Sequence, residues 1–114
     1  MADLGDVIEL TVDLPQDQLR AGTRGAIVHC YEDGAYEVEI ADANGETIEL
    51  LPLRREQFIV VWRAETRQPV PVWERVGDLL RMLPEDSGQA VLDFARFLAV
   101  HQRGVGAATS AGRG

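Results

Sequence analysis

The chain has 114 residues, of which 46% are hydrophobic and 26% charged, and its formal net charge is −8. The length excludes a second full catalytic domain, and the apolar content excludes a disordered chain. No run approaches the ~20 apolar residues of a membrane helix. Residues 1–10 carry acids where a signal peptide carries bases, so we expect a cytoplasmic protein with no membrane association.

The excess negative charge lies in the first half of the chain. Residues 1–63 hold 13 acids and five arginines, whereas residues 64–114 hold six acids and six arginines. A negative field attracts basic partners and repels phosphate backbones. We therefore expect a basic protein partner and consider nucleic acid an unfavourable one.

Apolar and polar residues alternate along residues 6–63, which predicts strands with one buried face. A long loop follows the first strand, with Leu14 and Leu19 turned inward. Asp33-Gly34 and Asn44-Gly45 are hairpin signals, and a 3₁₀-like turn precedes an apolar last strand that should pack under another element. The five predicted strands are residues 6–12, 25–31, 36–41, 46–51 and 58–63.

Five short strands with a long first loop, two tight hairpins and a 3₁₀-like turn match the order of an SH3-like barrel. Several segments also resemble the small bacterial family called domain of unknown function 4926. They are residues 6–10, 14–15, 22–28, 31–34, 36–39, 44–47 and 53–60. The resemblance, over about residues 4–63, implies a compact SH3-like barrel without an established activity, and it suggests an antitoxin or immunity role beside toxin-like proteins. With the strand pattern, we expect a five-stranded SH3-like β-barrel over residues 1–63.

A change of pattern follows the strands. Pro69 and Pro71 predict an extended connector at residues 64–71. From Val72 apolar residues recur at spacings of three and four, which predicts a helical hairpin over residues 72–103.

Within this hairpin, Pro84 separates the two predicted helices. Residues 79–98 resemble a short helical motif of bacterial antitoxin-like proteins. The glycine-rich residues 104–114 are predicted to be disordered.

The residues form no catalytic constellation. His29 and His101 are the only histidines, and they lie on different predicted elements. His29 and Cys30 cannot act as base and nucleophile together, because adjacent strand residues point to opposite faces. Residues 42–46 lack the full acidic spacing and the final glutamate of a calcium loop. We expect no enzymatic activity, no cofactor and no metal site.

A nucleic-acid-associated barrel is the alternative function. Residues 22–25 lack the lysine and the following helix of a phosphate loop, so their glycines should serve the backbone instead. Barrels that bind nucleic acids combine basic loops with exposed aromatic residues. The arginines available for this are Arg20, Arg24, Arg54 and Arg55.

Two predicted surfaces suit a protein partner. One is the acidic face of the third and fourth strands, and the other is the apolar side of the second helix. The helix side is either a partner anchor or a dimer interface, unless it closes over the fifth strand. The sequence thus predicts a non-enzymatic, antitoxin-like interaction module that binds a basic, toxin-like protein and can self-associate. The candidate partner-binding residues are Glu37, Glu39, Glu49, Phe94, Phe97 and Leu98.

Overall fold

The computed structural model describes the backbone of residues 2–109 and the side chains of residues 2–102. The chain divides into two compact units, residues 1–81 and 82–114, which are considered separately. The described elements are β1 (Val7–Leu10), η1 (Pro15–Asp17), β2 (Arg24–Cys30), β3 (Tyr36–Ala41), β4 (Thr47–Leu53), η2 (Arg55–Gln57), β5 (Phe58–Arg63), β6 (Gln68–Pro69), α1 (Val72–Arg81) and α2 (Glu85–Thr109).

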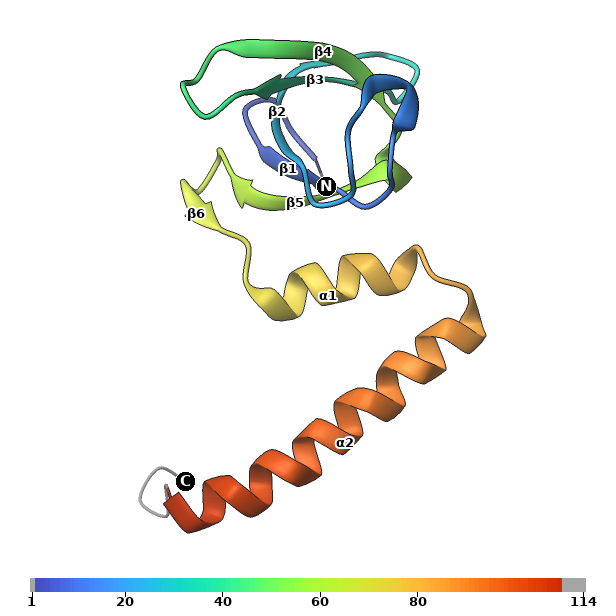
Figure 1. Ribbon diagram of the computed structural model, residues 1–114, viewed down its shortest axis with the longest axis vertical. Coiled ribbons are helices and arrows are strands. Elements are labelled where there is room, and N and C mark those ends of the chain that lie inside the picture. The colour runs from blue at the N-terminus through green and yellow to red at the C-terminus, as the bar shows by residue number, and fades with distance from the viewer. Residues whose placement is uncertain (1, 110–114) are drawn as a thin grey trace. The chain divides into compact units, whose positions relative to one another are not determined.

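The first unit is built on one antiparallel sheet with the strand order β4-β3-β2-β1-β5-β6 (Figure 1). A mainly β fold with C-terminal helices is therefore confirmed. The closed, five-stranded barrel is wrong, because β4 and β6 form two separate edges of an open sheet. The chain turns through Arg67, at φ 54°, and pairs Pro69 with Trp62 of β5. This return makes a sixth strand from part of the predicted connector.

Local turn chemistry agrees with the predicted hairpins. Gly34 and Gly45 adopt φ values of 92° and 84°, which a glycine reaches without a Cβ clash. They connect β2 to β3 and β3 to β4, as the Asp-Gly and Asn-Gly pairs predict.

The curved sheet encloses a core in which Phe58 is completely buried. The Tyr36 ring meets Phe58 edge to face, with 5.4 Å between centroids. Leu14 and Leu19 pack against this core from the loop after β1, as predicted. The buried core residues are Ala2, Ile8, Leu10, Ile27, Val38, Ile40, Leu51, Leu53, Phe58, Val60 and Val70.

Strand β5 is buried on both faces, which confirms that it packs under another element. Val60 lies in the core, whereas Ile59 and Val61 are 5% exposed on the opposite face. Helix α1 lies against β5 (Figure 1).

The polar side of α1 faces β5. Glu74 forms an ion pair with Arg63, and Asp78 Oδ2 lies 3.9 Å from Arg55 Nη2. The apolar side of the helix is left exposed, with Trp73 at 74% exposure. Sequence periodicity locates this helix, but it predicts the opposite side as the buried one.

Helix α2 belongs to the second unit, so the two helices of the predicted hairpin fall on either side of a unit boundary after Arg81. The helix continues to Thr109, through part of the segment predicted to be disordered. Residues 110–114 of that predicted tail lie outside the described residues. Among the described residues, no helix combines the length and apolarity needed to cross a membrane.

Candidate protein-interaction surfaces

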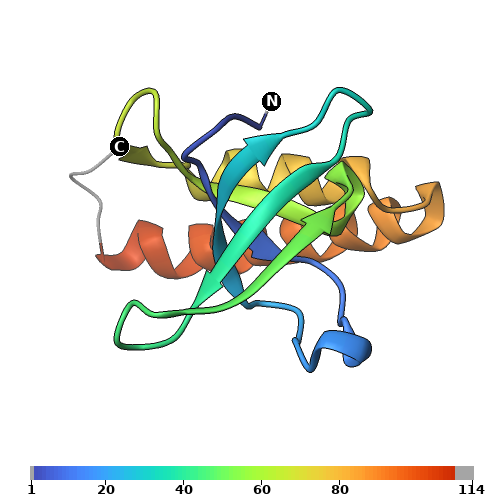
Figure 2. The same cartoon turned by 90° about the horizontal axis from the view of Figure 1, so that it is seen from above.

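The convex side of β2, β3 and β4 forms the first surface. Glu37 lies opposite His29 on β2 and Pro52 on β4, and Glu39 lies opposite Leu50. Opposed residues in antiparallel strands project to the same face, so these side chains share the face away from the core. Figure 2 looks down on β3 and β4 side by side. We call this surface the outer sheet face, and it comprises His29, Tyr31, Glu37, Glu39, Leu50 and Pro52.

Polar contacts fix the two carboxylates at the centre of this face. The Tyr31 hydroxyl donates a hydrogen bond of 3.0 Å to Glu37 Oε1, and the His29 ring meets Tyr31 edge to face at 4.6 Å. Thr47 Oγ1 donates to Glu39. Both glutamates are half-buried, and each is held in place by a hydroxyl donor.

The Glu37 contact changes the acidity of Tyr31. The hydrogen bond is the main cause that raises the pKa of Tyr31 above its ordinary 10.0, with smaller contributions from lost hydration and from the charges of Glu37 and Asp33. The phenol therefore stays protonated, and continues to donate to Glu37, to a higher pH than an ordinary tyrosine.

Glu49 does not belong to the outer sheet face. It lies opposite Ile40, whose side chain is in the core, so Glu49 projects to the other side of the sheet. A register shift between Ile40 and Ala41 leaves Ile48 unpaired. Ile48 and Leu50 are 57% and 55% exposed, although the sequence alternation predicts them to be inward.

Strand β4 also extends beyond its predicted end at residue 51. Pro52 is part of the strand and lies opposite Glu37. A proline lacks the N–H of a sheet hydrogen bond but is tolerated on an edge strand, and β4 is the edge. The buried residues of this strand are Leu51 and Leu53. Leu51 and Leu53 alternate with Pro52, and this alternation was the sequence signal for which residues of β4 face inward.

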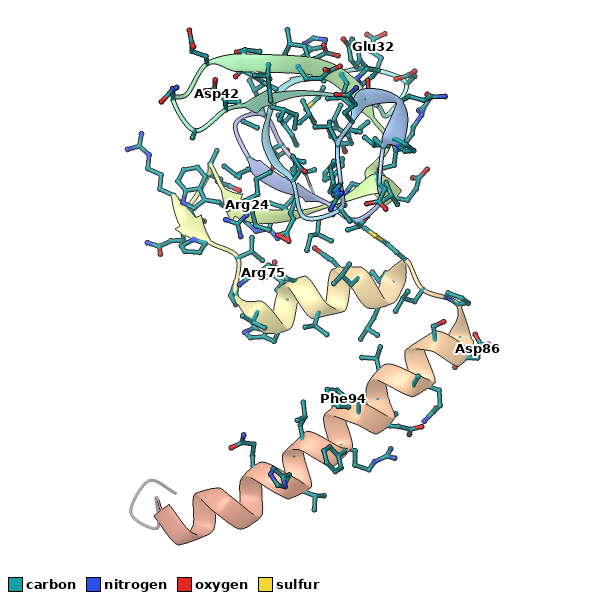
Figure 3. The ribbon with its side chains drawn as sticks, viewed as in Figure 1. Arg24, Glu32, Asp42, Arg75, Asp86 and Phe94 are labelled. Atoms are coloured by element: carbon teal, nitrogen blue, oxygen red, sulfur yellow. The ribbon has the colours of Figure 1, made fainter. Side chains whose placement is uncertain are left out.

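The charge along β3, the β3–β4 hairpin and β4 is negative. Residues 36–53 contain five acids and no basic residue. Asp42 caps the β3–β4 hairpin by accepting hydrogen bonds of 2.9 and 3.0 Å from the backbone N–H groups of Asn44 and Glu46. Figure 3 shows Asp42 in this hairpin and Glu32 in the preceding one.

Three of the four arginines that were considered for nucleic-acid binding form ion pairs with acidic side chains. Arg24 Nε lies 3.7 Å from Glu9 Oε1, and Arg54 Nη2 lies 3.7 Å from Asp33 Oδ2. Arg55, paired with Asp78, also lies over the Phe58 ring at 5.0 Å. These contacts reduce the positive potential that a phosphate backbone requires.

Gly25 serves the backbone, as predicted for residues 22–25. A Cβ at this position would lie 2.6 Å from Ile40 Cδ1, 2.7 Å from Val38 Cγ1 and 2.9 Å from the Glu39 carbonyl oxygen. Only a residue without a side chain lets β2 approach β3 this closely.

The surface of the first unit has shallow grooves. One, of about 430 Å³, is lined by Tyr31, Asp33, Ala35, Pro52, Leu53 and Arg54 and continues from the outer sheet face. Another, of about 390 Å³, is lined by Asp13, Pro15, Gln18, Leu19 and Arg20. Within the part of the chain that the structure describes, no group of three or more histidine, cysteine or acidic side chains is arranged to hold a metal ion.

The second surface lies on α2. Phe94 and Phe97 are 61% and 60% exposed, and Leu98 is 41% exposed. The Phe94 and Phe97 rings stack at 6.2 Å between centroids, and Phe97 stacks on His101 at 5.9 Å. Figure 3 shows Phe94 along the helix that begins near Asp86. We call Phe94, Phe97 and His101 the aromatic ladder.

The fold and its surfaces define a small antiparallel-sheet domain with a docked helix and an acidic convex face. The chain belongs to the family described as domain of unknown function 4926, whose model matches residues 4–60. The match covers β1 to β4 and part of β5 and excludes both helices, so it does not extend to the antitoxin-like helical motif. No curated protein and no solved structure matches the chain significantly.

Proposed function

We propose that this protein is a non-enzymatic interaction module that binds a basic protein partner through its outer sheet face. The position of Glu37 and Glu39, half-buried beside the exposed Leu50, carries this proposal. A carboxylate next to apolar surface is less screened than a fully solvated one, so it attracts a cation more strongly.

An arginine of the partner fits this face best. A planar guanidinium can donate two hydrogen bonds to one carboxylate and stack on an aromatic ring. Glu37 and Tyr31, joined by their 3.0 Å hydrogen bond, offer these two features side by side. Leu50 and Pro52 supply apolar contact for the aliphatic part of the arginine side chain.

The charge distribution supports an antitoxin- or immunity-like role for the module. Residues 1–63 carry 13 acids against five arginines, and a field of this sign accelerates association with a basic protein. In this proposal a basic, toxin-like protein is held in the cytoplasm in a stable complex. The ion pairs of Arg24, Arg54 and Arg55 make nucleic-acid binding the weaker alternative.

We also propose an SH3-like class for the sheet. The long loop after β1, the two hairpins and the turn η2 before β5 occur in the order of an SH3-like barrel. In this view, β6 occupies the edge of β5 that closure of the barrel would otherwise use.

The experiment is affinity capture with the purified full chain, followed by titration of the protein identified. The test variant is Glu37→Gln with Glu39→Gln, and the control is Glu56→Gln with Glu65→Gln, which removes the same charge from exposed sites elsewhere. We expect one stoichiometric basic protein that the wild type and the control retain and that the test variant loses. Equal retention by the test variant would exclude the outer sheet face as the binding site.

A further inference from the structure

We propose that α2 is a dimerisation helix that pairs antiparallel with α2 of a second copy of this chain. This inference goes beyond the proposed function, since it concerns a different unit and requires no basic partner.

The apolar side of α2 is too wide for a helix that remains in water. Val91, Phe94 and Leu98 recur at spacings of three and four, which forms a continuous seam on one side. Phe97 and Leu92, at 60% and 50% exposure, widen it on its two flanks. A helix in a protein gains most of its stability by burying such a face, so we infer a partner surface of similar length.

The charges of α2 favour a second copy as that partner. Its acids, Glu85, Asp86 and Asp93, all lie in the first nine residues of the helix, and no acid follows Asp93 in the chain. The basic residues, beginning with Arg96, all follow Asp93. With three acids and two arginines within residues 85–109, the helix has almost no net charge with which to select a strongly basic or acidic partner.

The same distribution favours the antiparallel orientation. Parallel pairing would place acidic half beside acidic half and align the two helix macrodipoles, which is unfavourable. Antiparallel pairing places each acidic half beside the basic half of the other copy. If the two Phe94 rings meet at the centre, residues equally distant from Phe94 face each other, so Val91 of one copy lies opposite Phe97 of the other and Ser87 lies opposite His101.

Sedimentation velocity of the purified full chain over a concentration series tests the pairing. We expect a reversible dimer of twice the 12.6 kDa chain mass. Leu98→Glu should convert it to a monomer, whereas Val100→Glu should not. Val100 is 66% exposed and lies half a turn away from Val91 on the helix. A monomeric wild type at every concentration, or equal dissociation by both variants, would overturn the proposal.

Disulfide trapping tests the orientation in a Cys30→Ser background. A mixture of Ser87→Cys chains with His101→Cys chains should form a mixed disulfide-linked dimer, whereas Ser87→Cys alone should not cross-link. The reverse result would establish parallel pairing and refute the antiparallel arrangement. Both measurements use the purified chain alone, so their failure leaves the test of the outer sheet face unaffected.

Discussion

The carboxylate of Asp6 joins the beginning of the sheet to the end of β5 through a 2.9 Å hydrogen bond from the backbone N–H of Ala64 to Asp6 Oδ1. The other oxygen, Oδ2, accepts a 2.9 Å hydrogen bond from the N–H of Asp3. Asp6 is only 2% exposed, so both bonds are shielded from water.

We therefore predict that Asp6→Ala lowers the free energy of unfolding by about 2–3 kcal/mol, because it leaves two N–H groups without their acceptor. Urea unfolding followed by circular dichroism measures the loss. Glu65→Ala, on the exposed surface, is the control and should change the stability by less than about 0.5 kcal/mol. Equal stability of the two variants would contradict a structural role for Asp6.

Gly25→Ala and Gly77→Ala should change stability in opposite directions. The added methyl group at residue 25 would overlap Ile40, Val38 and the backbone of Glu39, and overpacking of this kind costs about 1–3 kcal/mol. At residue 77, inside α1, the methyl group meets nothing within 4 Å. There alanine should stabilise the helix by about 0.5–1 kcal/mol. Thermal unfolding of both variants against the wild type decides the sign of each change.

The Tyr31–Glu37 hydrogen bond predicts a measurable pH effect. Because folding raises the pKa of Tyr31, the bond contributes stability that is fully present below the unfolded pKa of about 10. This contribution disappears as the pH rises through the folded pKa.

Glu37→Gln should lower the pKa of Tyr31 toward 10.0, since it replaces the carboxylate acceptor that is the main cause of the shift by a weaker, neutral amide oxygen and removes the nearby charge. Ultraviolet titration of the tyrosinate in a Tyr36→Phe background isolates this group. Glu56→Gln, which removes an acid outside the outer sheet face, is the control. An unchanged titration curve in Glu37→Gln would show that the hydrogen bond is not formed in solution.

Asp78 anchors α1 to the sheet and should be sensitive to substitution. Its side chain is 13% exposed and contacts Arg55 as well as Arg81, whose Nη1 lies 2.7 Å from Asp78 Oδ1. Asp78→Ala should lower the free energy of unfolding by on the order of 1 kcal/mol, because Arg55, which is less exposed than Arg81, loses its counter-charge. Hydrogen exchange at the amides of α1 should accelerate. Asp93→Ala, which removes only the exposed contacts with Arg96 and Gln89 on α2, should leave this exchange unchanged.

The sequence was a good guide where local chemistry decides the structure. β3 and β5 have the predicted boundaries, because alternation and the Asp33-Gly34 and Asn44-Gly45 turns act over a few residues. β4 was predicted in the wrong phase because a bulge at Ile48 changes which residues face inward, and a bulge depends on the neighbouring strand. The sequence pattern therefore placed Glu37 and Glu39 correctly on one face, but it wrongly added Glu49 to that face.

The placement of α1 was less predictable. Its apolar stripe, including Val72 and Val76, suggests a buried side, yet Glu74 and Asp78 face the sheet. Their counter-charges, Arg63 and Arg55, lie more than ten positions earlier in the chain. Periodicity within one segment contains no information on such distant charges. The exposed outward position of Leu50 was missed for a related reason, since it depends on pairing with Glu39.

The central position of β1 has a consequence for biosynthesis. Strand β1 is synthesised before both of its partners and pairs with β2 on one side and with β5 on the other, so one of its edges stays open until residues 58–63 have emerged. An open edge of this kind can pair with another nascent chain. Ribosome-bound chains that end before β5 should therefore depend more on chaperones than chains that include it.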